Sequence, residues 1–500
     1  MKNNITKLLN KNNIIKFLIT TLFLLFPMID ILRSTYIKNI EIFNISVIEF
    51  INFMLIGIAF LLTIPKINKK KKIIFSIYVI AFVLYLVFHI INTYNFNIDI
   101  FTKATPDFIT ETYYIIRVYI LPILLIIVLF SNRDIFNKEY YLKILKYLII
   151  EISGLIIVCN LLRFSYSSYD DEMALLNRTS FYDIFTYKGK AKELLTCGLF
   201  NSANQISIIL FMLLPLTIYN LHEHKNIKNL ILLLVQTISM IIVGTKVAAM
   251  GSVLVLIATL FAYFFFIIIR KEKIDKKYLT YHLLALLITT IFIFISPFYQ
   301  VMKSSISNQD NFVNEEQETI DYAYQKLEED LTDKEFIELL TKYNGVFKIS
   351  SMFYRMYPIE NDIEFWKTLA KRDNRLNNDY RIIKSDIIER VKVRNNNQKL
   401  DSLLGIGYTS NFMDIEKDYI YQYYLFGIIG SILLIGVYIY FYIQNIFKLF
   451  KGKYFEYEYC LRILSSFIGL VGCYFSGHLF GWTSPMIVLA TTLCIGRVNE

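Results

Sequence analysis

The strongest constraint on this 500-residue chain is a series of apolar segments of membrane-spanning length, which one long polar stretch interrupts near the end. A helix needs about 20 apolar residues to cross the hydrocarbon core of a bilayer. Hydrophobic residues make up 55% of the chain, which is too apolar for a soluble fold of this length. The pattern therefore predicts an all-α polytopic membrane protein. The twelve predicted membrane helices lie at about 14–32, 44–64, 73–95, 112–130, 144–163, 201–220, 228–243, 246–269, 280–299, 420–446, 460–478 and 482–497.

The polar stretch divides the chain into a membrane domain at 1–299, a large loop at 300–418 and a second membrane domain at 419–500. The first part of the loop is acidic and the later part is basic. Apolar residues recur in the loop at helical spacing, which predicts short helices lying over the membrane surface. These residues are Phe353, Met356, Ile363, Trp366 and Leu369.

The distribution of charge predicts how the chain is oriented. Lysine and arginine residues gather in alternate short loops, whereas the loops near Lys38, Lys103 and Gly481 hold few of them. The positive-inside rule places the basic loops and both termini in the cytoplasm, and the large loop outside. A second long loop, at 164–200, falls on the same outer side, and two long loops on one face indicate where chemistry occurs. The net charge of +10 thus reflects membrane topology, and no nucleic-acid partner is expected.

The end of the large loop is bracketed by two glycine-containing stretches, Leu-Leu-Gly-Ile-Gly-Tyr at 403–408 and Phe-Gly-Ile-Ile-Gly at 426–430. Glycine allows tight turns and close helix packing. Asp414, Glu416 and Asp418 lie between them, where the chain re-enters the membrane, so a carboxylate there can face a substrate at the interface. The same acids also suit the first turn of a helix, where they stabilise it without chemistry. The residues alone leave both interpretations open.

A stretch with several side-chain amides, Gly-Leu-Phe-Asn-Ser-Ala-Asn-Gln at 198–205, opens the sixth predicted helix. The amides of Asn201 and Asn204 are suited to hydrogen-bond a sugar at the membrane surface. The alternative is a polar helix cap, which is common at such a position.

A lysine lies between two apolar helices in the stretch Gly-Thr-Lys-Val-Ala-Ala-Met-Gly-Ser at 244–252. On the outer side, the ammonium of Lys246 suits a phosphate or pyrophosphate, and the small residues after it allow close helix packing. The alternative is a loop lysine that snorkels toward water.

Five ionisable residues lie in or beside predicted membrane helices. Arginine is the better bidentate partner for phosphate, so the arginine near the outer end of the fourth helix is the preferred phosphate anchor. The alternative is an internal ion pair or a side chain that snorkels to the interface, and some of the five are expected to pair with one another. The five residues are Asp30, Arg33, Glu49, Arg117 and Glu151.

These stretches, in this order, resemble the O-antigen ligase and O-antigen polymerase (Wzy-like) superfamily of bacterial membrane glycosyltransferases. Residues 198–205 resemble its G-F-x-x-x-N stretch, and residues 244–252 resemble its (T/S)-x-(S/T)-R-(G/A) stretch. Residues 403–430 resemble its G-x-G, acidic or histidine residue, and GxxG that close a large outer loop. The resemblance covers the chain from about residue 110 to the end, and the first helices match only in hydropathy.

The chain also departs from the family pattern. Lys246 stands where the family usually has arginine, and the large loop contains no histidine, which lipopolysaccharide ligases typically use there. Glu416 and Asp418 occupy that neighbourhood, which favours a polymerase-like branch. Arg381 lies at about the spacing of a loop arginine in relatives, although its flank at 377–380 departs from the expected pattern.

The resemblance implies a GT-C-like fold and glycosyl transfer at the outer face of the cytoplasmic membrane of a bacterium. The implied donor is an undecaprenyl-diphosphate-linked oligosaccharide, and the product is a surface or capsular polysaccharide. Arg117, Lys246 and Arg381 would bind and stabilise the leaving pyrophosphate, with Arg381 in a catalytic position. Glu416 or Asp418 would act as the base for the acceptor hydroxyl. Asn204 would contribute to substrate binding, and neither a cofactor nor a metal is expected.

The resemblance implies the lipid-linked oligosaccharide and the bilayer as partners, together with the chain-length regulator and the flippase of the same pathway. Two alternatives stay open. One is ligase-type transfer of finished glycan to a cell-envelope acceptor, which uses the same donor. The other is a flippase or transporter of lipid-linked sugars, although the two similar halves common in transporters are not apparent in the sequence.

Overall fold

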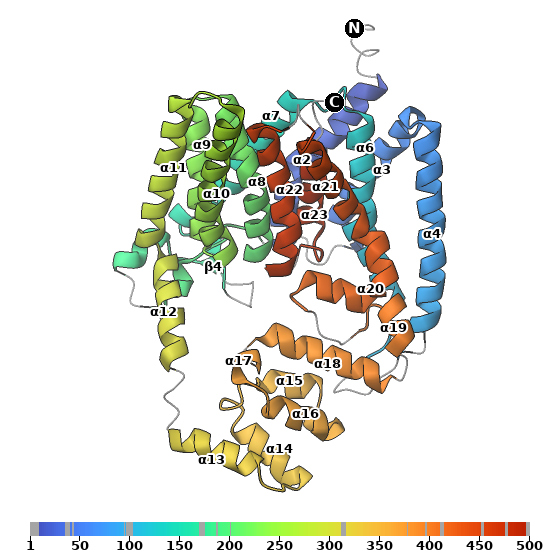
Figure 1. Cartoon of the computed structure of the whole chain (residues 1–500), viewed down its shortest axis with the longest axis vertical. Coiled ribbons are helices and arrows are strands. Elements are labelled where there is room, and N and C mark those ends of the chain that lie inside the picture. The colour runs from blue at the N-terminus through green and yellow to red at the C-terminus, as the bar shows by residue number, and fades with distance from the viewer. Residues whose placement is uncertain are drawn as a thin grey trace. The chain divides into compact units, whose positions relative to one another are not determined.

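The computed structural model shows a nearly all-helical chain with two short antiparallel ribbons, β1–β2 (Glu41–Ile42 and Ile45–Ser46) and β3–β4 (Ser165–Tyr166 and Leu176–Asn177). Figure 1 shows the elements in chain order. The residues that the structure describes are 10–35, 41–42, 45–94, 96, 104–169, 176–186, 189–200, 202–311, 317–377, 379–395, 398–410, 415–451, 455–475 and 479–496.

The chain forms two compact units. The first unit comprises Met1–Ile74, Tyr113–Met302 and Ile435–Glu500, and the second comprises Phe75–Thr112 and Lys303–Leu434. The two units are defined by contacts between residues, and these contacts do not report which residues lie in the bilayer. The division of the chain into membrane domains and a loop therefore stays a prediction.

Long apolar helices make up the first unit, and each predicted membrane segment coincides with a helix or a pair of helices. Among the described residues of the whole chain, nine helices are long and apolar enough to cross a membrane. Two more, α9 and α23, are apolar but have only 17 and 13 residues. The helices of the first unit are α2 (Lys11–Thr35), α3 (Val47–Thr63), α6 (Leu121–Ser131), α7 (Lys138–Leu161), α8 (Ala203–Glu223), α9 (Ile227–Val243), α10 (Lys246–Arg270), α11 (Lys276–Ile295), α21 (Gly436–Leu449), α22 (Tyr457–Phe475) and α23 (Thr483–Ile495). The residues of α5 (Phe108–Ile115) and of α12 (Pro297–Asn311) are divided between the two units.

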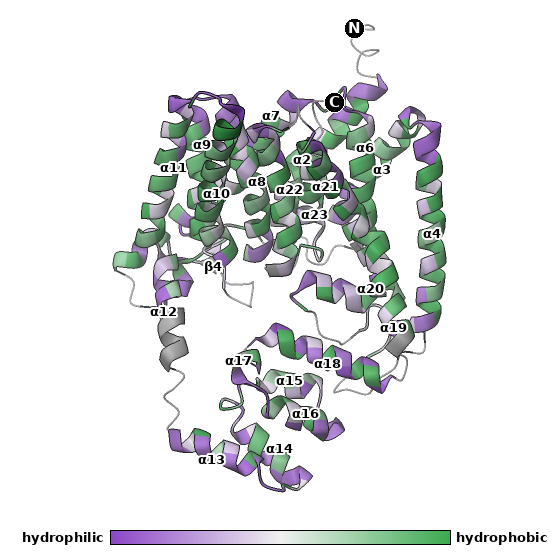
Figure 2. Ribbon diagram, in the orientation of Figure 1, coloured by the Kyte–Doolittle hydropathy of each residue, from purple (hydrophilic) through white to green (hydrophobic). Residues whose placement is uncertain are grey.

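Burial separates a central helix from peripheral ones in the first unit. Nearly all of α8 is buried, and it packs against α9, α10 and α22. By contrast, α10 and α11 expose large apolar side chains such as Phe261 (72%) and Leu287 (57%). Figure 2 shows α10 and α11 hydrophobic along most of their length and hydrophilic at their ends. Exposed apolar faces of this length fit a lipid environment, so the prediction of an all-α polytopic membrane protein is confirmed.

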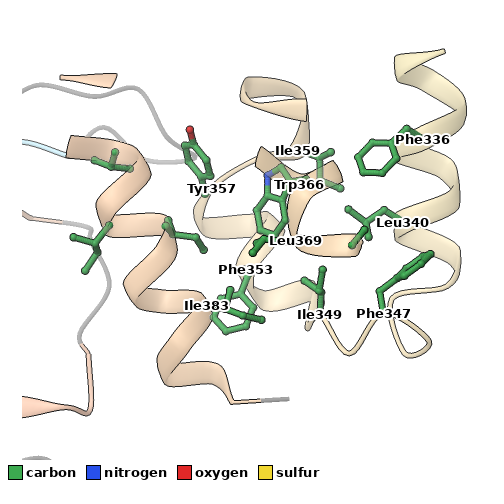
Figure 3. Close-up of a cluster of buried hydrophobic side chains, with 14 of the residues drawn as sticks. Phe336, Leu340, Phe347, Ile349, Phe353, Tyr357, Ile359, Trp366, Leu369 and Ile383 are labelled. Carbon is green, nitrogen blue, oxygen red and sulfur yellow. The ribbon is translucent and has the colours of Figure 1, made fainter. Parts of the chain in front are cut away.

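Short helices around their own apolar core make up most of the second unit. The core surrounds the fully buried Trp366, and Figure 3 shows its side chains converging from several helices. Of the apolar residues predicted to lie on short helices, Phe353, Trp366 and Leu369 are buried, and Met356 and Ile363 pack against the core. The helices are α4 (Lys69–Thr93), whose first turns belong to the first unit, and α13 (Gln317–Leu327), α14 (Asp333–Lys342), α15 (Ser351–Met356), α16 (Ile363–Ala370), α17 (Asn374–Asn377), α18 (Tyr380–Arg394), α19 (Gln398–Leu404) and α20 (Asp418–Leu434).

The predicted single helix at 420–446 is interrupted. Gly427 has φ 65° and ψ −172°, which no helix accommodates, so α20 bends there before α21 begins at Gly436. A Cβ at position 427 would lie 2.4 Å from the carbonyl carbon of Leu403, so only glycine fits. The predicted membrane segment still lies within one candidate span, Asp418–Leu449, but the bend was not predicted because hydropathy does not report backbone bends.

Candidate functional site

Arg117 lies on η2 (Ile116–Ile120), a π-helical turn between α5 and α6 in the first unit. Such turns are often found at functional sites. The guanidinium Nη1 donates to Glu49 Oε1 at 3.1 Å, and Nη2 donates to the carbonyl of Gly481 at 3.4 Å. The ring of Tyr113 lies 5.3 Å from the guanidinium carbon, within cation–π range.

The Arg117–Glu49 ion pair is largely buried. The side chains of Arg117 and Glu49 are 17% and 5% exposed. Removing one partner from a buried pair costs about 3–5 kcal/mol, because the other charge is left without compensation. The ion pairing expected among the charged residues of the membrane helices is therefore confirmed for these two. Glu49 thus holds the guanidinium of Arg117 in place and compensates its charge.

Lys246 begins α10 and is exposed. The turn before it is well defined: Gly244 ends α9 in the left-handed region (φ 68°), and Thr245 Oγ1 accepts from the backbone N–H of Ala248 at 3.2 Å. The second long predicted loop supports this turn, since the hydroxyl of Tyr169 donates to the Gly244 carbonyl at 2.7 Å. Lys246 has no ion-pair or hydrogen-bond partner among the described residues. Its ammonium adds to the positive end of the helix dipole, which favours an anion.

Asn204 lies exposed in the first turn of α8. The predicted polar cap of this helix is Ser202, whose hydroxyl accepts from the N–H of Gln205 at 3.4 Å. The hydroxyls of Ser207 and Thr245 lie 2.6 Å apart and join the N-terminal ends of α8 and α10. The structure therefore brings Asn204 and Lys246 to neighbouring helix ends, although 42 residues separate them in sequence (246 − 204 = 42).

Arg381 and Glu416 form an ion pair in the second unit. Arg381 lies in the first turn of α18, and its Nε donates to Glu416 Oε2 at 3.1 Å. A second pair beside it crosses between the same segments, with Lys417 Nζ 3.9 Å from Asp379 Oδ2. The Arg381 and Glu416 side chains are 34% and 40% exposed, so both are accessible to a substrate. The structure thus brings together the predicted loop arginine and one of the two predicted bases.

The two predicted bases differ in burial. Asp418 begins α20 and is only 3% exposed, whereas Glu416 two residues earlier is accessible. A base must reach the proton that it removes, so Glu416 is the better placed of the two. Asp418 occupies the first turn of a helix, where a carboxylate stabilises the helix dipole. The predicted Asp414 and Asn201 lie outside the described residues.

A family model described as O-antigen ligase like membrane protein matches residues 11–496. The chain belongs to this family. The resemblance drawn from the motifs is thereby confirmed, and it extends to the first helices. Membership suggests glycan transfer or polymerisation in the cell envelope by a multi-pass membrane protein that handles lipid-linked glycan. No curated protein and no solved structure matches the chain.

Sequence reasoning about this O-antigen ligase like protein missed a buried pair. His89 on α4 is fully buried, and its Nε2 lies 2.7 Å from Oε1 of Glu111, which is 4% exposed. The signal in the sequence was a polar face on an apolar helix, since Tyr85, His89 and Asn92 recur every three or four positions. Glu111 gave no comparable signal, because it lies at the edge of an apolar segment where acids are common.

Among the described residues, no three His, Cys, Asp or Glu side chains lie close enough together to hold a metal ion.

Proposed function

We propose that this protein polymerises lipid-diphosphate-linked oligosaccharide repeat units into a surface polysaccharide at the outer face of the bacterial cytoplasmic membrane. A hydroxyl of one lipid-linked unit attacks the anomeric carbon of another. The bond from that carbon to the diphosphate oxygen breaks, the lipid diphosphate leaves with the electron pair, and the hydroxyl proton passes to a base. The observation that carries the proposal is the Arg381–Glu416 pair, in a chain that matches the family over residues 11–496.

Three cations would stabilise the leaving diphosphate. Arg381 and Lys246 are accessible, and Arg117 would offer N–H donors of a guanidinium that Glu49 holds in place. Cations positioned where negative charge develops lower the barrier, and in a site that excludes water they act more strongly. Arginine in addition offers two parallel donors to a phosphate. Asn204, beside Lys246 on the neighbouring helix end, would hydrogen-bond the sugar.

Glu416 would be the base for the acceptor hydroxyl. Its ion pair with Arg381 is partly exposed, and such pairs contribute only about 0.2–1 kcal/mol. A diphosphate can therefore displace Glu416 from Arg381 at low cost. The displaced carboxylate then lies beside the bound diphosphate, where the acceptor hydroxyl must approach. Asp418, which is buried, would support the first turn of α20.

The proposed orientation follows the positive-inside rule, with both termini in the cytoplasm and the large loop outside. This places Arg381 and Glu416 on the side where lipid-linked units are assembled into polymer. The proposed donor carrier is undecaprenyl diphosphate. A flippase would supply the repeat units, and a chain-length regulator would set when polymerisation stops.

A ligase-type transfer of finished glycan to a cell-envelope acceptor is the second candidate, and the family description favours it by name. The absence of histidine from residues 300–418 favours the polymerase, because ligases typically use a histidine in that loop. Both reactions need the same donor and the same cations. The acceptor distinguishes them.

Deleting the gene and analysing the lipid-linked glycans tests the proposal. Loss of a polymerase leaves single repeat units on the outer leaflet, and loss of a ligase leaves long lipid-linked chains. Accumulation of single units on the inner leaflet would indicate a flippase and would overturn the proposal. Protection from a membrane-impermeant glycosidase distinguishes the two leaflets.

A further inference from the structure

A buried polar network lies at the end of α4 in the second unit. His89 Nε2 lies 2.7 Å from Glu111 Oε1, and His89 Nδ1 lies 2.6 Å from the carbonyl oxygen of Leu404. Tyr85 donates its hydroxyl to the carbonyl of Phe426 at 2.8 Å. Burying two ionisable groups costs free energy, which the hydrogen bonds of the pair must offset. It holds the segment at residues 404–408, called the strap below.

The hydrogen bonds define where the protons of the pair lie. A carbonyl oxygen can only accept, so His89 Nδ1 carries a proton and donates it to Leu404. One more proton lies between Nε2 and Glu111 Oε1. The other carboxyl oxygen, Oε2, accepts from the backbone N–H of Tyr408 at 2.7 Å. The pair thus contacts both ends of the strap through one side chain each.

The backbone N–H groups of the strap are already used. A glycine-rich loop that binds phosphate needs free N–H groups pointing at the ligand. Here each of four successive N–H groups donates to protein, so the strap is a structural support and not a phosphate cradle. The four bonds are Gly405 to the Asp401 carbonyl at 2.8 Å, Ile406 to the Tyr424 carbonyl at 2.9 Å, Gly407 to the Leu425 carbonyl at 3.0 Å, and Tyr408 to Glu111 at 2.7 Å.

The strap in turn holds the helix that follows the proposed base. The bend at Gly427 leaves the carbonyls of Tyr424 and Leu425 available, and the strap donates to both. The hydroxyl of Tyr424 also lies 3.0 Å from Ser385 Oγ on α18, the helix whose first turn carries Arg381. A continuous set of contacts therefore runs from His89 and Glu111 through the strap to both segments of the Arg381–Glu416 pair.

We propose that His89 and Glu111 are positioning residues for glycosyl transfer. Their hydrogen bonds fix the strap, and the strap in turn fixes the positions of Glu416 and Arg381 relative to one another. This inference rests on the proposed function. Both residues are buried, so neither is proposed to contact the substrate. Misplacing a reacting group by about 1 Å can cost on the order of 100-fold in rate, so a remote clamp is enough to control kcat.

Two substitutions at one position separate positioning from proton transfer. Glu111→Ala removes the acceptor for the Tyr408 N–H and the partner of His89. Glu111→Gln preserves every contact: its oxygen accepts from Tyr408, and its N–H₂ donates to Nε2 of a neutral His89 that keeps its Nδ1 proton. The amide cannot exchange a proton with histidine as the carboxyl does.

The assay uses the full-length protein in proteoliposomes, with lipid-linked repeat units extracted from the deletion strain as the probe. Hydrogen exchange of the peptide at 403–410 reports on the strap, and the peptide at 363–370 around Trp366 reports on folding of the second unit. For E111A we expect faster exchange at 403–410, unchanged exchange at 363–370 and a fall in kcat of about 100-fold with little change in KM. For E111Q we expect near wild-type exchange and activity.

Each other outcome has a defined meaning. An E111Q protein as inactive as E111A, with a protected strap, would show that the pair acts through its proton and would overturn the positioning role. An E111A protein with a loosened strap and normal kcat would also overturn it. If E111A unfolds, Glu111→Asp, which keeps the charge and shortens the reach, takes its place. Arg381→Ala should leave the strap protected, and if it stays active the proposed function fails while the exchange result stands.

Discussion

Replacing Arg381 by alanine should remove activity while leaving the fold intact, and the exposure of its ion pair explains why. Arg381 and Glu416 are 34% and 40% exposed. Pairs of this kind contribute about 0.2–1 kcal/mol to stability, because solvent screens them and both side chains lose rotamer freedom. The loss of stability in R381A is therefore expected to be at most about 1 kcal/mol. The protein should reach the membrane in normal amount.

The effect on the reaction should be much larger than the effect on stability. Removing one preorganised donor that stabilises developing charge typically costs about 10²–10³ in kcat. That loss corresponds to about 2.7–4 kcal/mol in the transition state. The measurement compares the rate of chain extension in proteoliposomes with the amount of protein in the membrane and its resistance to denaturant.

A matched control in the same unit is Arg390, which is 38% exposed and donates to both oxygens of Asp362 at 2.6 and 3.0 Å. The Asp362 side chain is 7% exposed, so R390A leaves a buried carboxylate without its cation. We expect R390A to lose more stability than R381A, but to keep its activity per folded molecule. A fully active R381A protein would refute the assignment. So would an R381A protein that is less stable than R390A, because the pair would then be structural.

Three further results follow from the structure. Lys246→Arg should keep activity and Lys246→Met should lower it, both at normal amounts of protein in the membrane, because the exposed ammonium has no partner among the described residues. Burial alone would raise the pKa of Asp362, but hydrogen bonds from Arg390 and Tyr357 lower it below the ordinary value. A lowered pKa stabilises the folded state above the unfolded pKa, so resistance of the second unit to proteolysis should fall as the pH drops below about 4, and less so in R390A. Trp366→Ala should destabilise the second unit by about 3–5 kcal/mol, detectable as protease cleavage between α13 and α18, whereas the exposed Leu376→Ala should not.

The membrane helices could be predicted from the sequence because each one needs about 20 consecutive apolar residues, a pattern that is visible within a single segment. Each of the twelve apolar segments coincides with helical structure, although only nine described helices meet the criteria of length and hydropathy. The short helices of the second unit were predicted for a similar reason. Apolar positions repeat at helical spacing, and Trp366 and Phe353 are fully buried. The glycines of the strap were also recognised as points of tight turning.

The contacts between distant residues could not be predicted. Glu111 and Tyr408 are separated by 297 positions, and His89 and Leu404 by 315. No pattern within one segment reports that a helix end and a loop end meet. The bend at Gly427 was hidden for a related reason, because the residues on both sides of it are equally apolar. The ion pair between Arg381 and Glu416 joins positions 35 apart, and which of the two carboxylates stays exposed depends on the fold.

The two arginine–glutamate pairs differ in a way that assigns them different parts in the proposed reaction. The Arg117–Glu49 pair has side chains 17% and 5% exposed, so separating its charges costs several kcal/mol and no substrate is expected to do so. In the proposed reaction Arg117 would therefore keep Glu49 as its partner and would contribute by orienting a diphosphate. The Arg381–Glu416 pair is accessible and weak, so an incoming diphosphate can replace the carboxylate as the partner of Arg381. In the proposed reaction this replacement would release Glu416 from Arg381 beside the bound donor, where it would accept the proton of the acceptor hydroxyl. The proposed order would thus bring the free carboxylate and the donor together at the same step.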